Sequence, residues 1–210
     1  MSILPRPSLS TQRRLTAVMQ VLLFAIVVYG LLAGQPKAIT NGGIGLGVTL
    51  LPAIIRRNYQ FSLDPWLGLW ITTAVFLHTL GSAGLYVQFS WWDSVTHALS
   101  ASLVAGVGYT AARVIDLHNE EIHIPTQFVF VYLFIVVLAF GVIWELFEFA
   151  LDLISAATGL TMPLAQHGLD DTVVDMLYNS LGALLVALFG QVHLTGVAES
   201  LRDRLLTSGS

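Results

Sequence analysis

The residues of this chain that could do chemistry are carboxylates and imidazoles set into strongly apolar segments. Glu145 and Glu148 stand inside an apolar run that starts near Phe128. They are three residues apart, so on a helix their side chains share one face. A charged side chain at the centre of a bilayer costs about 2.5–3.5 kcal/mol on insertion scales. Two such groups on one face therefore require partners.

Two further pairs of ionisable residues have the spacing of one helical turn. Asp93 is followed four residues later by His97, and Asp171 is followed four residues later by Asp175. Residues four apart lie above one another on a helix, so each pair presents both side chains in one direction. Asn179 continues the face of the second pair.

The composition indicates what kind of elements hold these residues. Of 210 residues, 55% are hydrophobic and only 10% are charged, whereas a soluble domain carries about 25% charged residues. With several apolar runs of about 20 residues, this predicts an all-α, polytopic protein of the cell (plasma) membrane. The chain has no cysteine, which excludes disulfides and thiolate metal sites. It has no large basic patch, so the sequence gives no indication of nucleic-acid binding.

Six transmembrane helices are predicted. The first follows Arg13 and Arg14 and is too long for the apolar part of a signal peptide, so we expect an uncleaved span. The second is the shortest and reaches only about 21 Å, less than the hydrocarbon core of about 30 Å, unless it begins near Ala38 or is re-entrant. Small residues in the fourth (Ser100, Ala101, Ser102, Gly106 and Gly108) favour close helix packing. The expected spans are Leu15–Ala33, Gly42–Ile55, Trp66–Leu85, Asp93–Ile115, Thr126–Ile154 and Asp170–Val192.

The basic residues predict the orientation. With six spans and a cytoplasmic N-terminus, all eight arginines lie inside and only Lys37 lies outside, as the positive-inside rule requires. We expect a polar lead over 1–14, one transmembrane helical domain over 15–193, and a cytoplasmic tail over 194–210 that is frayed from Glu199.

This orientation brings the ionisable side chains to one depth. The fourth and sixth helices begin at the outer surface, the fifth ends there, and His78 stands in the outer third of the third helix. We therefore predict one outward-facing pocket lined by six side chains: Asp93, His97, Glu145, Glu148, Asp171 and Asp175.

Clustered carboxylates repel one another unless protons or a cation compensate them. No arginine or lysine stands at this depth, so the compensators are protonated histidine, shared protons or a metal ion. Carboxylate oxygens with imidazole suit Zn²⁺, Mn²⁺ or Fe²⁺, and Mg²⁺ where waters complete the shell. All six residues are candidate metal ligands, and Glu145 and Glu148 are also candidate catalytic residues.

Simpler interpretations stay open for some residues. Asp93, Asp170 and Asp171 stand at helix starts, where they could cap free backbone N–H groups. His78 is typical of a hydrogen-bonded interior histidine. The inner loop of Asp116–Pro125 is predicted to be solvated, and Asp152 and His167 are placed at the membrane interface. The residues expected to be solvated in the inner loop are His118, Glu120, Glu121 and His123.

Three motifs in order resemble the YjdF-like family of uncharacterised bacterial and archaeal membrane proteins. They are Asp93-Ser-Val-Thr-His97, then Glu145-Leu-Phe-Glu148-Phe149, then Gln166-His-Gly168 with Asp171-Thr-Val-Val-Asp175-Met176. The third departs from the family pattern, because His167 follows Gln166 and Asp170 replaces an aromatic residue. The VanZ-like family is more distantly similar. The resemblance covers about 66–190 and implies a helical bundle with a polar outward-facing site, but no established reaction.

Two classes of function remain. One is a metal-dependent hydrolase or transferase acting on a lipid-linked or envelope substrate, with metal-bound water as nucleophile and a carboxylate as general base. The other is a non-catalytic cation or proton site in a transporter or a membrane assembly subunit. The inner halves of the helices offer almost no ionisable residue, which argues against a proton or ion relay across the membrane. The sequence leaves catalysis, the substrate and the oligomeric state open.

Overall fold

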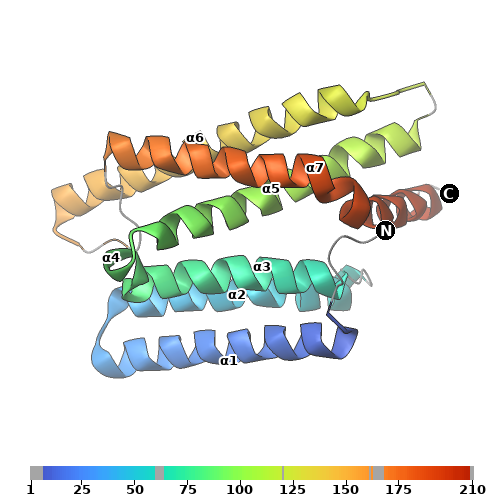
Figure 1. Cartoon of the computed structure of the whole chain (residues 1–210). Helices are drawn as coiled ribbons and strands as arrows, with labels where there is room; N and C mark the ends of the chain where they lie inside the picture. Colours follow the sequence, from blue (N-terminus) through green and yellow to red (C-terminus); the bar gives the residue numbers. More distant parts are fainter. Residues whose placement is uncertain (1–6, 60–63, 120, 161, 163–167, 209–210) are drawn as a thin grey trace. The chain divides into compact units, whose positions relative to one another are not determined.

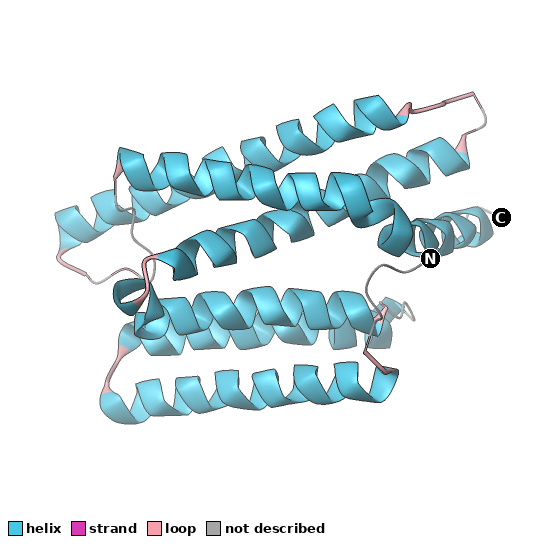
Figure 2. Ribbon diagram, in the orientation of Figure 1, coloured by secondary structure: helices cyan, strands magenta, loops and turns pink. Residues whose placement is uncertain are grey.

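The computed structural model describes residues 7–59, 64–119, 121–160, 162 and 168–208, and within these all regular structure is helical (Figures 1 and 2). Six helical stretches in this part of the chain are long and apolar enough to cross a membrane. The prediction of an all-α bundle with about six spans is confirmed. The elements are α1 (Leu9–Ala33), α2 (Pro36–Tyr59), α3 (Pro65–Leu80), the π-helical turn η1 (Gly81–Leu85), α4 (Tyr86–Gln88), α5 (Trp91–His118), α6 (Thr126–Thr158) and α7 (Leu169–Ser208).

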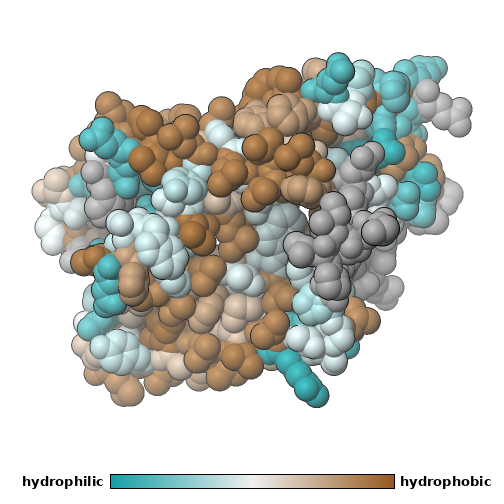
Figure 3. Space-filling model, in the orientation of Figure 1, coloured by the Kyte–Doolittle hydropathy of each residue, from teal (hydrophilic) through white to brown (hydrophobic). Residues whose placement is uncertain are grey.

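Contacts divide the chain into two compact units, residues 1–96 with 147–167, and residues 97–146 with 168–210. The first unit contains α1, α2, α3, η1 and α4. The second contains α7 and most of α5 and α6. Large apolar side chains are exposed along the helices of both units, for example Leu32 and Val107, and Figure 3 shows apolar residues over much of the visible surface. Such a surface suits a surrounding of lipid rather than water.

In the first unit α1, α2 and α3 all pack on one another. Glycines of α2 make this close: a Cβ added at Gly42 would lie 2.9 Å from Val27 of α1, and one at Gly45 would lie 2.9 Å from Thr79 Oγ1 of α3. Helix α2 begins at Pro36, six residues before the predicted start, because proline suits the first turn of a helix, where its missing N–H is not needed. Its 24 residues reach about 36 Å. The expected start at Gly42 is therefore wrong, and the alternative of an earlier start, near Ala38, agrees with the structure.

The third span is not the single α-helix predicted over Trp66–Leu85. It changes to the π-helical turn η1 after Leu80, and Gly84 within that turn has a φ of 135°, which glycine adopts at no steric cost. Tyr86 then folds against Gly81, where an added Cβ would lie 2.3 Å from the Tyr86 ring. The Tyr86 hydroxyl lies 2.7 Å from His78 Nδ1. The interpretation of His78 as a hydrogen-bonded histidine agrees with this contact.

In the second unit α5 and α7 approach closely at Gly182. A Cβ there would lie 2.4 Å from the backbone oxygen of Ala98 and 2.9 Å from the Cβ of Ala101. Helix α6 meets α7 at Gly141, where an added Cβ would lie 2.7 Å from Met176. The contact at Gly182 includes Ala101 of α5, one of the small residues that were predicted to favour close packing of that helix.

Helix α7 also runs further than the predicted end at Val192, and continues to Ser208. Leu194 and Ala198 are buried, and Tyr109 of α5 reaches Thr195, with 3.4 Å between the two hydroxyl oxygens. These contacts keep the segment helical, so the expectation of a frayed chain from Glu199 is wrong for the described residues up to Ser208.

The inner loop is shorter than predicted, because α5 continues to His118. Asp116, whose side chain is 8% exposed, pairs with Arg113, and its other oxygen accepts a hydrogen bond from the Ile124 backbone at 2.8 Å. Asp116 therefore ties the end of the loop to α5. Glu121 and His123 are exposed, and Glu120 lies outside the described residues.

Replacing Glu120, Glu121 and His123 together with alanine is expected to change the unfolding free energy by less than about 1 kcal/mol, the usual range for surface positions. Asp116→Ala is expected to cost about 2–3 kcal/mol, because it removes two hydrogen bonds to a charged group. Thermal melting of the purified protein in detergent compares the two variants. A larger loss in the triple variant than in Asp116→Ala would show that the exposed side chains hold the loop.

Candidate functional site

The central contact of the candidate site joins α5 to α7. His97 Nε2 lies 3.5 Å from Asp175 Oδ2, and the Asp175 residue is only 2% exposed. Gly182 stands seven residues after Asp175, two turns along the same face of α7. The close approach that this glycine allows brings Asp175 within reach of His97.

Asp93 stands one turn before His97 on the same continuous helix, α5. One ligand atom from each of Asp93, His97 and Asp175 lies within 4.8 Å of the other two. Asp93 is the third residue of α5, which begins at Trp91, so it follows the position of a capping residue. Two carboxylates and an imidazole thus meet at a spacing that one cation could bridge.

Glu145 approaches the same face of α7. Its Oε2 accepts a hydrogen bond from Thr172 Oγ1 at 2.7 Å, and Thr172 stands three residues before Asp175. Its Oε1 is buried and has no hydrogen-bond partner within the described residues, and the whole residue is 5% exposed. A buried carboxylate oxygen without a partner is costly, so it calls for a proton or a cation.

The remaining predicted residues are placed as follows. Glu148 is buried one turn after Glu145 on α6, and Asn179 is buried one turn after Asp175 on α7. Asp171 is half-buried in the first turn of α7 and is not among the three residues whose ligand atoms meet, while Asp170 is exposed. Gln166 and His167 lie outside the described residues.

The buried ionisable side chains in the described part of the chain are acidic. They are Glu145, Glu148 and Asp175, and no described lysine or arginine side chain is buried. The imidazole of His97 lies close to Asp175 and Asp93. The arrangement is therefore suited to a positive ligand.

Two polar partners were missed by the sequence reasoning. Thr172, which donates to Glu145, could have been found from its position one turn before Asp175. Tyr86, which contacts His78, could not, because η1 changes the helical register between them. Thr96 supports the start of α5 by donating to the backbone oxygen of Asp93 at 2.8 Å.

Residues 14–196 match the sequence profile of a family described as "Predicted membrane protein (DUF2238)". The match includes the described residues of the site and all six apolar helices, wholly or in large part. No curated protein and no solved structure matches the chain.

Proposed function

Since the chain belongs to this DUF2238 family of predicted membrane proteins, we propose that it is a multi-pass protein of the cell membrane that binds a divalent metal ion. Asp93, His97 and Asp175 are the proposed ligands. The observation that carries the proposal is the approach of their three ligand atoms to within 4.8 Å of one another. The resemblance of the motifs to the YjdF-like family, and more distantly to the VanZ-like family, points to the same residues.

The chemistry of the ligands narrows the choice of metal. Two carboxylates and one imidazole suit Zn²⁺, Mn²⁺ or Fe²⁺, and Mg²⁺ would need several waters in addition. Glu145 supports a cation nearby, because its Oε1 is buried without a hydrogen-bond partner in the described structure. Glu148 and Asp171 are the further candidates for completing the coordination shell.

The reaction that best fits such a site is hydrolysis or group transfer on a lipid-linked or envelope substrate. A bound metal would supply a water of lowered pKa as the nucleophile. Glu145 is held through Oε2 by Thr172, and its Oε1 has no hydrogen-bond partner among the described residues. This supports Glu145 as the general base that would accept the proton of that water. Glu148 is the second candidate for this role. The non-catalytic alternative, a cation or proton site in a transporter or assembly subunit, uses the same ligands without this step.

Metal analysis of the purified full-length protein tests the proposal directly. We expect about one equivalent of a divalent transition metal after purification without chelator, and a melting temperature that falls when a chelator is added. Bound ligand stabilises a fold in proportion to the logarithm of its concentration over Kd, which at 1,000 Kd is about 4 kcal/mol. Protein that holds no metal and does not respond to added Zn²⁺ or Mn²⁺ would contradict the proposal.

The orientation proposed from the arginines puts this site at the outer surface of the membrane. The residues 15–193 would form the membrane domain, and the tail of 194–210 would lie in the cytoplasm. Because the chain has no cysteine, single cysteines can report the side of each loop without background. Leu160→Cys, after α6, is expected to react with an impermeant thiol reagent in intact cells. Asn119→Cys, after α5, is expected to react only after the membrane is opened. Both positions are exposed, so labelling of both from the same side would reject the orientation.

A further inference from the structure

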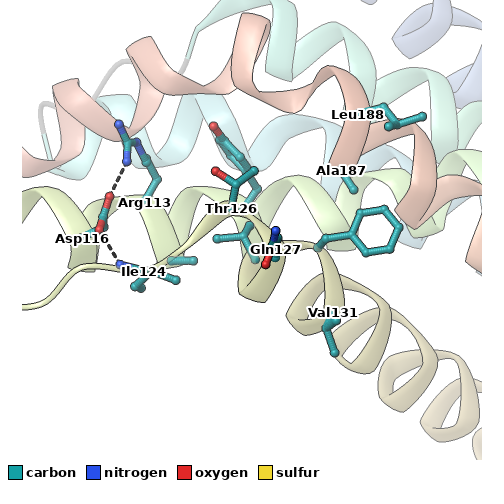
Figure 4. A pocket seen from close by; sticks show the side chains of 12 residues that line it. Arg113, Asp116, Ile124, Thr126, Gln127, Val131, Ala187 and Leu188 are labelled. Atoms are coloured by element: carbon teal, nitrogen blue, oxygen red, sulfur yellow. Dashed lines mark hydrogen bonds and ion pairs between the residues drawn. The ribbon is translucent and has the colours of Figure 1, made fainter.

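A second site lies within the unit formed by residues 97–146 and 168–210, at the other end of α5. A cavity of about 470 Å³ opens there between α5, the start of α6 and the middle of α7 (Figure 4). Arg113, which lines it, follows His97 by 16 residues, or about 24 Å along the helix axis. The cavity is therefore separate from the proposed metal site.

The walls of the cavity are mostly apolar. Ala112 of α5 and Ala187 of α7 face it with short side chains, and Val131 and Phe130 of α6 and Leu188 of α7 complete much of the wall. The volume falls within the range of about 300–1,000 Å³ that is typical of small-molecule sites. Walls of this kind, in a helix bundle that crosses a membrane, favour a hydrocarbon ligand over a polar one.

One end of the cavity is polar. Arg113 and Asp116 form an ion pair there, and both Asp116 oxygens are engaged, one by Arg113 and the other by the Ile124 backbone (Figure 4). The Arg113 Nε is buried and has no hydrogen-bond partner in the described part of the chain. A buried donor without an acceptor is unfavourable, so Arg113 offers a place for an acceptor oxygen brought by a ligand.

The polar end also lies close to the ends of two helices. Arg113 stands five residues before the end of α5, and Thr126, which begins α6, lines the same cavity. Helix ends of a membrane bundle meet the interface between lipid and water, where arginine side chains contact headgroups. Basic pockets between transmembrane helices are known to hold phosphate headgroups.

We propose that this cavity binds a membrane phospholipid. One acyl chain would occupy the apolar part between Ala112 and Ala187, and a phosphate or ester oxygen would accept the hydrogen bond of Arg113 Nε. The apolar cavity and the unpaired Arg113 Nε together favour a ligand in which a hydrocarbon chain is attached to an oxygen acceptor. This inference does not depend on the proposed metal site.

Native mass spectrometry of the full-length protein, released from membranes in mild detergent, tests the proposal. We expect the wild type to retain one phospholipid. Ala187→Phe, which fills the cavity, is expected to reduce the lipid-bound fraction at least fivefold, and Arg113→Gln at least threefold. Ala111→Phe is the matched control, because Ala111 is exposed and does not line the cavity, and it is expected to retain lipid as the wild type does.

Ala187→Leu fills less of the cavity and takes the place of Ala187→Phe if the larger side chain prevents folding; an intermediate loss is expected. Melting temperatures measured with added phospholipid and, separately, with inorganic phosphate distinguish the source of the acceptor. Only the phospholipid is expected to stabilise the wild type. Wild-type protein without lipid, equal lipid retention in the filled variant, or equal stabilisation by inorganic phosphate would overturn the proposal.

Discussion

Asp175→Asn is expected to lower the metal content of the purified protein at least tenfold and to make its melting temperature insensitive to chelator. Asparagine keeps the shape of the side chain but removes the charge, and Asp175 is the most buried of the three proposed ligands. Removing the metal would also remove the stabilisation that it provides, about 4 kcal/mol when the free metal is 1,000 times its Kd. Elemental analysis and melting with and without chelator measure both effects.

Asp170→Asn is the control, because it makes the same change of charge on the same helix at an exposed position. It is expected to leave metal content and melting temperature unchanged.

Glu148→Gln distinguishes a bound metal from shared protons. If a metal balances the acids, this variant loses metal. If the acids share protons, the variant relieves repulsion and stabilises the fold at neutral pH. A wild type without metal, together with stabilisation by Glu148→Gln and by Asp175→Asn, would contradict the metal site and would indicate a cluster of acids that share protons.

Gly182→Val is expected to destabilise the protein by about 3 kcal/mol or more, because overpacking a tight contact forces backbone to move. The added Cβ would meet the backbone oxygen of Ala98 at 2.4 Å, so a rotamer change could not relieve the clash. The same shift would draw Asp175 away from His97, so metal content is expected to fall together with stability. Melting and elemental analysis of one preparation test both consequences.

Gly196→Val is the matched control, since it lies on the same helix and an added Cβ there has no atom within 4 Å among the neighbours considered. It is expected to change stability by less than about 1 kcal/mol, the scale of helix propensity differences. Equal effects of the two variants would show that loss of a glycine in α7, rather than the contact between α5 and α7, is responsible.

The apolar runs were sufficient to predict six long helices, because the length and hydropathy needed to cross a bilayer are properties of sequence alone. The start of α2 was left between Ala38 and Gly42, because polar residues near Asn41 weaken the apolar signal although Pro36 already suits a helix start. The length of α7 was missed for a different reason. Burial of Leu194 and Ala198 depends on tertiary contacts that a local pattern does not contain.

For the site, helical spacing was enough to predict that Asp93 and His97 share a face. Which acids meet them was not predictable from spacing, because Asp171 and Asp175 have the same face but differ in burial. Burial of Asp175 depends on how closely α7 approaches α5, and the close contact at Gly182 is a tertiary feature that residue spacing does not contain. The ion pair of Arg113 with Asp116 was missed because Arg113 was expected near the inner end of the fourth helix and Asp116 in the solvated loop that follows it.

The kink within η1 has a consequence for which residue this chain can carry there. Gly84 has a φ of 135°, so the helix is broken at this residue and Tyr86 follows it in a new direction. A residue with a Cβ at position 84 would disfavour this φ and favour a straight helix through the kink. Tyr86 would then leave His78. The backbone conformation of one glycine is therefore coupled to the hydrogen bond of one histidine.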